Sequence, residues 1–250
     1  YQLWDYAFQR QWLFYKVWGN LLYDNETPDS YFAKALADKF ELKDGTKLLE
    51  AWKLASRNPN RLASFYSGTW DGTLYSEGFS RNKGFIDINS FIIHPVLDSR
   101  YVNIPDFVNE NFNKETQITP LQLAEETENE SKKTMELLSE IRNGKVTEAL
   151  AIELNDTEFW ANYGDYLALK LRAGVALHRY RQGKNESDKK EAVNYLKSAL
   201  SHWEKMVKLV EQYNIQPLPY QFDDEFSWRK YIPDVKQDIE IAANACKNKD

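Results

Sequence analysis

The 250-residue sequence lacks several features that would assign it to a class of function. Its one cysteine, Cys246, excludes an intrachain disulfide and a metal site built from several thiolates. No apolar run approaches the ~20 residues that span a bilayer, so we expect no membrane insertion. Acidic residues outnumber basic ones by 38 to 32, and the net charge of −6 does not attract phosphate backbones. We therefore expect no nucleic acid partner.

Sequence motifs that carry chemistry are missing as well. There is no Gly-x-x-x-x-Gly-Lys-Ser/Thr loop, no Gly-x-Gly-x-x-Gly, no His-Glu-x-x-His and no Gly-x-Ser-x-Gly. The three histidines, His94, His178 and His202, are scattered, and we expect packing or surface roles for them. The acidic stretch 125–140 has the pattern of a solvated helix face rather than of a calcium site. We expect no cofactor, no metal and no complete catalytic centre within the chain.

The chain does contain abundant aromatic residues, at 14%, and apolar residues that recur at helical spacing. The spacing predicts helices over 3–23, 28–40, 46–57, 119–142, 146–154, 157–181 and 187–213, and a last one from about 233. This pattern predicts an all-α fold, an irregular bundle of antiparallel helices that forms a single domain over 1–250. Around residues 66–118 we expect a long loop-rich insertion with short helices; the alternation at 86–89 also allows a short strand.

The first expected helix is apolar around most of its circumference. One stripe contains Trp4, Phe8, Trp12, Tyr15 and Leu22, and a second contains Phe14, Val17 and Leu21. A helix of this kind is normally buried, so we predict that the aromatic stripe is core and not a cofactor site. Domains seldom begin inside a buried helix, and the sequence shows neither an initiator Met nor a signal peptide. We therefore expect a C-terminal piece of a larger protein.

The loop from Gly68 to Gly78 is the candidate functional site. A sugar site needs flat aromatic faces and carboxylates that accept bonds from hydroxyl groups. Four residues within eight positions supply both, namely Trp70, Asp71, Tyr75 and Glu77. They are the candidate carbohydrate-binding residues of the chain. The alternative is a packing role, in which the two aromatic rings fix the loop to the helices and the aspartate caps a turn; catalysis by a carboxylate pair is the least favoured interpretation.

Three helical stretches together resemble a known family. They are residues 12–29, with Trp-Leu-Phe-Tyr-Lys-Val-Trp-Gly-Asn and Thr-Pro-Asp; residues 156–180, with Phe-Trp-Ala, Tyr-Leu-Ala and Lys-Leu-Arg; and residues 192–228, with Ala-Val, His-Trp and Phe-Ser-Trp. They resemble the helical C-terminal region of α-glucuronidase-like glycoside hydrolases and related uncharacterised proteins of glycan-degrading bacteria. Where that family often has Arg after Gly, this chain has Asn20.

The resemblance implies a catalytic barrel N-terminal to this chain as its partner, and no family catalytic carboxylate matches a residue here. It also implies bacterial export, to the periplasm or the cell surface. We therefore expect a helical accessory domain of a carbohydrate-active protein that is not catalytic by itself. Two alternatives stay open, a free-standing glycan-binding module and a helical protein-interaction scaffold, although no constant repeat period supports the scaffold.

Overall fold

A computed structural model describes residues 5–66, 79–81, 84–219 and 225–245. The predicted all-α fold is confirmed: helices dominate, and strands in these ranges are limited to two antiparallel pairs of two residues each. Strand β1 (Ser80–Arg81) pairs with β2 (Gly84–Phe85), and β3 (Leu218–Pro219) pairs with β4 (Glu225–Phe226). None of the helices in the described part has the length and apolar character needed to cross a bilayer.

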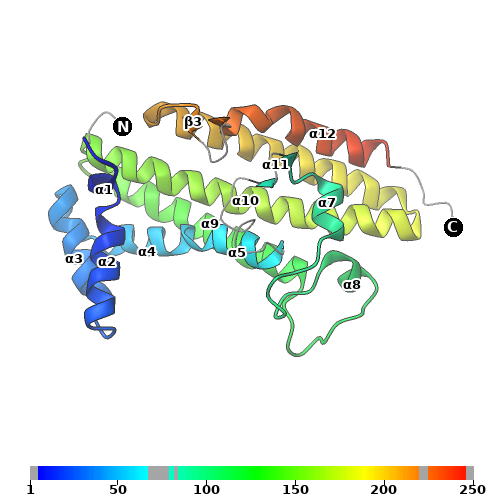
Figure 1. Cartoon of the computed structure of the whole chain (residues 1–250), viewed down its shortest axis with the longest axis horizontal. Helices are drawn as coiled ribbons and strands as arrows, with labels where there is room; N and C mark the ends of the chain where they lie inside the picture. The colour runs from blue at the N-terminus through cyan, green and yellow to red at the C-terminus, as the bar shows by residue number, and fades with distance from the viewer. Residues whose placement is uncertain (1–4, 67–78, 82–83, 220–224, 246–250) are drawn as a thin grey trace.

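The helices are arranged around one long central helix, α10 (Figure 1). In chain order they are α1 (Ala7–Arg10), α2 (Trp12–Tyr23), α3 (Asp29–Phe40), α4 (Thr46–Ala55), α5 (Arg57–Phe65), α7 (Ile88–Ile93), α8 (Ile104–Val108), α9 (Pro120–Arg142), α10 (Glu148–Gly183), α11 (Glu186–Tyr213), the 3-10 turn η1 (Trp228–Tyr231) and α12 (Ile232–Ala243). Helix α10 packs mainly against α9 and α11, while α12 covers α11 and α4 lies against α9. Helices α1, α2 and α3 gather at one end of the long axis (Figure 1).

Side-chain caps account for the starts of the three long helices. Thr119 and Gln122 form a reciprocal capping box at α9. Thr147 accepts a hydrogen bond from the Leu150 N–H at the start of α10, and Asn185 accepts one from Ser187 at the start of α11. Each cap satisfies a backbone donor that has no partner within its helix.

Helix α10 is continuous, so the prediction of two helices, over 146–154 and 157–181, was wrong. The polar run around 155–157 was interpreted as a break, but its side chains are bonded within the packed bundle. Asn155 Nδ2 donates to the Leu209 carbonyl at 2.8 Å, and Thr157 Oγ1 donates to the Glu153 carbonyl at 2.8 Å. These bonds offset part of the cost of burying polar groups, although Asn155 Oδ1 is buried without a hydrogen-bond partner, and the helix continues through the segment.

A second correction concerns the segment after the helix predicted over 46–57, where no further helix was predicted. The chain forms α5 there, with Pro59 in the first turn, where a missing N–H costs nothing. Asn58 Nδ2 donates to the Trp160 carbonyl at 2.9 Å and thereby fixes α5 against α10.

The loop-rich region is held to the bundle by a fully buried ion pair. Lys170 Nζ lies 2.7 Å from Asp238 Oδ2 and also donates to the Ile86 carbonyl at 2.7 Å. Asp238 Oδ1 accepts from the Ile88 N–H at 2.7 Å. The alternation of apolar and polar residues at 86–89 allowed a short strand, but no strand forms there. Asp87 is instead the N-cap of α7, which begins at Ile88. Burial lowers the pKa of Lys170 and raises that of Asp238, and each group opposes the other's shift.

The apolar core forms two clusters. The larger one surrounds α10 and α11 and contains Tyr163, Tyr166 and Trp203. The smaller one, at the end occupied by α2, α3 and α4, contains Leu13, Phe32 and Phe40 together with apolar residues of α9 and α10. The N-terminal helices therefore have a core of their own.

Candidate docking and ligand-binding surface

The outward side of α2 carries an exposed apolar face. Its members are Phe14, Tyr15, Trp18, Leu21 and Leu22, which we call the α2 outer face. Trp18 is 57% exposed and Leu22 is 76% exposed, whereas Leu13 is the one buried residue of the helix. At helical spacing Tyr15, Trp18 and Leu22 lie on the side of α2 away from Leu13, and Phe14 and Leu21 lie on the adjoining flank. An apolar patch of this kind marks an interaction site.

This arrangement corrects the prediction that the aromatic stripe of the first helix is core. The segment forms two helices, α1 and α2, and α3 and α4 provide a core for one side of α2. Phe8 and Tyr15, two members of the predicted stripe, are more than half exposed. Trp12 is half-buried and meets Phe40 edge to face. The apolar pattern typical of a buried helix is present in α2, but the described part of the chain covers one side of this helix.

Helix α1 is fixed to the bundle by charge. Arg10 forms ion pairs with Glu153, at 2.7 Å, and with Asp156, both on α10. Burial raises the pKa of both carboxyl groups, and the Arg10 guanidinium opposes that rise. Without this anchor, a helix of four residues would not hold a defined position.

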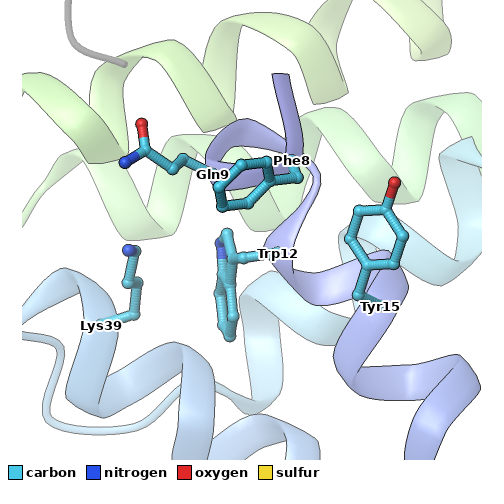
Figure 2. A pocket seen from close by; sticks show the side chains of 5 residues that line it. All are labelled: Phe8, Gln9, Trp12, Tyr15 and Lys39. Atoms are coloured by element: carbon cyan, nitrogen blue, oxygen red, sulfur yellow. The ribbon is translucent and has the colours of Figure 1, made fainter. Parts of the chain in front are cut away.

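A pocket opens between α1, α2 and α3 beside the α2 outer face. It is a shallow depression of about 560 Å³ that is largely open to solvent, and it is lined by Phe8, Gln9, Trp12, Tyr15 and Lys39. Figure 2 shows the Phe8 and Trp12 rings in the middle, with Gln9 and Lys39 on one flank and Tyr15 on the other. Lys39 Nζ lies 5.5 Å from the centre of the Trp12 ring, within cation–π range.

Two hydrogen bonds hold the side-chain amide of Gln9 in one orientation. Its Oε1 accepts from the backbone N–H groups of Asp5, at 3.0 Å, and Tyr6, at 3.2 Å. These bonds leave the amide NH₂ as the end that a ligand can meet. The pocket therefore offers aromatic faces together with an amide donor and an ammonium group.

A second polar cluster lies between α10 and α11. His202 Nδ1 is 3.0 Å from Asn162 Oδ1 and 3.5 Å from Asp165 Oδ2. Burial, reinforced by Glu128, raises the pKa of Asp165 to about 7. Burial, reinforced by Lys205, lowers the pKa of His202 to about 4. Both groups are therefore mainly neutral near pH 6 and do not form a charged dyad; the hydrogen bond of His202 across the two helices is the one to Asn162.

The predicted carbohydrate-binding residues, Trp70, Asp71, Tyr75 and Glu77, lie outside the described residues, so that site stays a prediction. Among the histidines, His94 stacks on Tyr66 with ring centres 4.0 Å apart, as expected for packing. In the part of the chain with described coordinates, no group of three or more His, Cys, Asp or Glu side chains is placed to hold a metal ion.

The pocket was missed at the sequence level because its residues come from three elements. The sequence of the first expected helix did contain an indication of the pocket. It has more aromatic residues than one side of a helix can bury. Lys39 contributes from α3, and nothing in its local sequence distinguishes it from the lysines of other surface helices.

Comparison with known proteins gives a likeness of fold. No family profile matches the chain, and no curated protein sequence matches it either. Among solved structures, the chain is similar to a GH138 enzyme targeting pectin rhamnogalacturonan II, with a TM-score of 0.73 and 14% sequence identity. The match covers 94% of this chain and 38% of that enzyme, so the chain spans well under half of its neighbour. The chain thus has the fold of a helical region that occurs within a glycoside hydrolase.

Proposed function

We propose that this chain is a helical accessory domain of a carbohydrate-active, glycoside hydrolase-like protein, in which it supports a separate catalytic domain. The observation that carries the proposal is the fold match, because nearly all of this chain corresponds to a minor part of an enzyme that targets a pectin. The chain belongs on this account to a bacterial protein of the periplasm or cell surface, and residues 1–250 act as one domain at its C-terminal side.

The α2 outer face is the surface by which we propose that the chain contacts its catalytic domain. Interfaces within a chain typically bury several hundred Å² on each side. The α2 outer face consists of three aromatic residues and two leucines and carries no charge. Lys16, the one charged residue of α2, lies elsewhere on the helix. The Arg10 anchor holds α1 beside this face and gives it a fixed shape.

Antibodies against this chain test the proposal in the cells that produce it. We expect them to detect a polypeptide much larger than 29.4 kDa. Mass spectrometry of that polypeptide should identify peptides of a catalytic domain in addition to those of this chain. A native polypeptide of the size of this chain would contradict the proposal.

The Gly68–Gly78 loop is a separate proposal for glycan binding, which rests on its sequence. Calorimetric titration with neutral and acidic oligosaccharides, repeated with Trp70→Ala, tests it. Binding that Trp70→Ala abolishes would support a glycan-binding role, and binding that is unchanged in the variant would contradict it.

A further inference from the structure

We propose that Asn143 is a site of spontaneous covalent modification, at which its side-chain amide becomes a carboxylate through a succinimide shared with Gly144. This is the one place in the sequence where a glycine follows an asparagine. Asn143 is the C-cap residue of α9, and Gly144 begins the short connection to α10. Both residues are exposed to solvent, so water and base reach them.

The reaction joins the backbone of one residue to the side chain of the other. The Gly144 nitrogen loses its proton to solvent base and attacks Cγ of Asn143, and the new C–N bond closes the succinimide ring. The bond from Cγ to the side-chain nitrogen breaks, and that nitrogen leaves as ammonia with a proton from solvent. Water then opens the ring at either carbonyl and produces aspartate or isoaspartate. Glycine favours ring closure because it has no Cβ to hinder the approaching nitrogen.

The structure leaves both reacting groups weakly held. Within the described residues the Asn143 side-chain amide forms no hydrogen bond. The N–H of Asn143 donates to the Glu140 carbonyl at 3.3 Å, and that of Gly144 donates to the Ile141 carbonyl at 3.1 Å. Both bonds have the tighter spacing of a 3-10 turn, and the end of a helix opens more readily than its middle. Opening of this turn frees the Gly144 nitrogen for attack.

The surroundings of Gly144 do not oppose this opening. A Cβ at this position would meet the Ile141 carbonyl oxygen at 3.4 Å, and no other described group outside the turn lies within its reach. Lys145, the next residue, forms an exposed ion pair with Glu41, and exposed pairs of this kind contribute little to stability.

A second pair with the same potential chemistry is closed off by its packing. Asp44 precedes Gly45 at the start of α4, and an aspartate can form the same ring. Its carboxylate accepts from the Thr46 N–H at 2.9 Å and from Thr46 Oγ1 at 2.7 Å. A Cβ on Gly45 would collide with the Ala33 carbonyl oxygen, so this backbone is held against α3. Packing therefore protects Asp44 and leaves Asn143 open.

The modification changes both the charge and the backbone at the end of α9. A carboxylate there is unfavourable because the C-terminal end of a helix is the negative pole of its dipole. Isoaspartate also adds a methylene group to the main chain between α9 and α10, which pack against each other. The modified chain carries one more negative charge than the −6 of the sequence, so isoelectric focusing separates it.

Incubation of the purified chain for several weeks, at neutral and at mildly alkaline pH, tests the proposal. Peptide mapping by mass spectrometry locates the gain in mass when an amide becomes a carboxylate, and protein isoaspartate methyltransferase detects isoaspartate. Mapping also separates Asn143 from Asp71, whose pair with Gly72 lies outside the described residues. Asn143→Gln and Gly144→Ala are the matched variants, and the alanine Cβ fits because its contact with the Ile141 oxygen is an ordinary one.

We expect Asn143 to be converted before any other asparagine, with isoaspartate among the products. Conversion should be faster at alkaline pH, because the attacking nitrogen must lose its proton. Gly144→Ala should slow it severalfold, and Asn143→Gln should remove the acidic form. An unchanged Asn143 after weeks at alkaline pH, earlier conversion of another asparagine, or an acidic form that persists in Asn143→Gln would overturn the proposal. An equal rate in Gly144→Ala would also overturn it, because the succinimide route depends on the glycine.

Discussion

Helices α2 and α10 both carry apolar residues on several sides, but they have opposite surroundings. Helix α10 is enclosed by α9, α11 and the shorter helices, and it buries residues on every side. In α2 one residue is buried, and the outer face is open. A helix that is apolar all round belongs inside a protein or between two bodies. This difference between α2 and α10 is the reason for our proposal that another body covers the α2 outer face.

The same difference applies to the charged groups. On α10, Lys170 is fully buried and has its counter-charge, Asp238, within hydrogen-bond distance. Beside α2, Lys39 is exposed and lies against an aromatic ring. Buried charge is tolerated when it is paired, so Lys170 needs Asp238 beside it, whereas the exposed Lys39 is hydrated and needs no counter-charge.

Breaking the enclosed helix should have the largest effect. Lys170→Met leaves the buried Asp238 carboxyl without its counter-charge and should lower the free energy of unfolding by about 3–5 kcal/mol. Urea denaturation followed by circular dichroism measures the loss. The double variant Lys170→Met/Asp238→Asn should recover much of it, because the amide needs no counter-charge. A double variant no more stable than the single one would show that Lys170 acts through its other contacts.

Removing the anchor of α1 should have the next effect. Arg10→Met leaves Glu153 and Asp156 without their cation and should cost about 1–3 kcal/mol at neutral pH. Burial already raises the pKa of these carboxyl groups, and loss of Arg10 raises it further. The deficit should therefore be smallest at low pH, where both carboxyl groups are protonated, and grow as the pH rises through their folded-state pKa. Lys53→Met, which removes an exposed pair with Asp29, is the control and should cost almost nothing.

The contact between Asp165 and His202 should respond to pH. Asp165 has a folded pKa of about 7 against about 3.9 when unfolded, so its contribution to stability falls as the pH rises from 4 to 7. His202 has a folded pKa of about 4 against about 6.5 when unfolded, so its contribution rises from pH 4 to 6.5. Asp165→Asn should therefore raise the free energy of unfolding at pH 8 by about 1–4 kcal/mol and leave the increase with pH that His202 contributes. Thermal unfolding across this range is the measurement. A variant whose stability still falls between pH 4 and 7 would contradict this assignment.

Polar substitution on the α2 outer face should have the smallest effect on this chain. Trp18→Gln/Leu22→Gln removes apolar groups that are largely exposed, so the free energy of unfolding should change by within about 0.5 kcal/mol. Leu171→Gln, at a fully buried position of α10, is the contrasting substitution and should be severely destabilising. Similar losses for the two substitutions would show that the α2 outer face already has a partner within the chain.

Much of the fold could be predicted from the sequence, because periodicity reports local geometry. Thr119 correctly predicted the start of α9, and the insertion around 66–118 was correctly predicted to contain loops with short helices. Failures occurred where tertiary contacts override local signals. Asn155 and Asp156 look like a helix break until their partners on α11 and α1 are known.

The site was less predictable for a related reason. Periodicity identifies a helix that is apolar all round, but it does not say whether the covering surface belongs to the same chain. For the first helix the sequence predicted burial, and the described residues cover one side of it. The pocket depends on Lys39 reaching Trp12 from another helix, which is a property of the packing of α2 on α3.

Cysteine labelling tests the central claim most directly, that the α2 outer face is covered in the native protein. In a Cys246→Ser background, Leu22→Cys and a control on α11, the exposed Lys197→Cys, are treated with a maleimide. The rates are compared between this chain alone and the native polypeptide that contains it. We expect Leu22→Cys to react rapidly in the chain alone and much more slowly in the native polypeptide, with Lys197→Cys unchanged. Equal rates for Leu22→Cys in both would contradict the account.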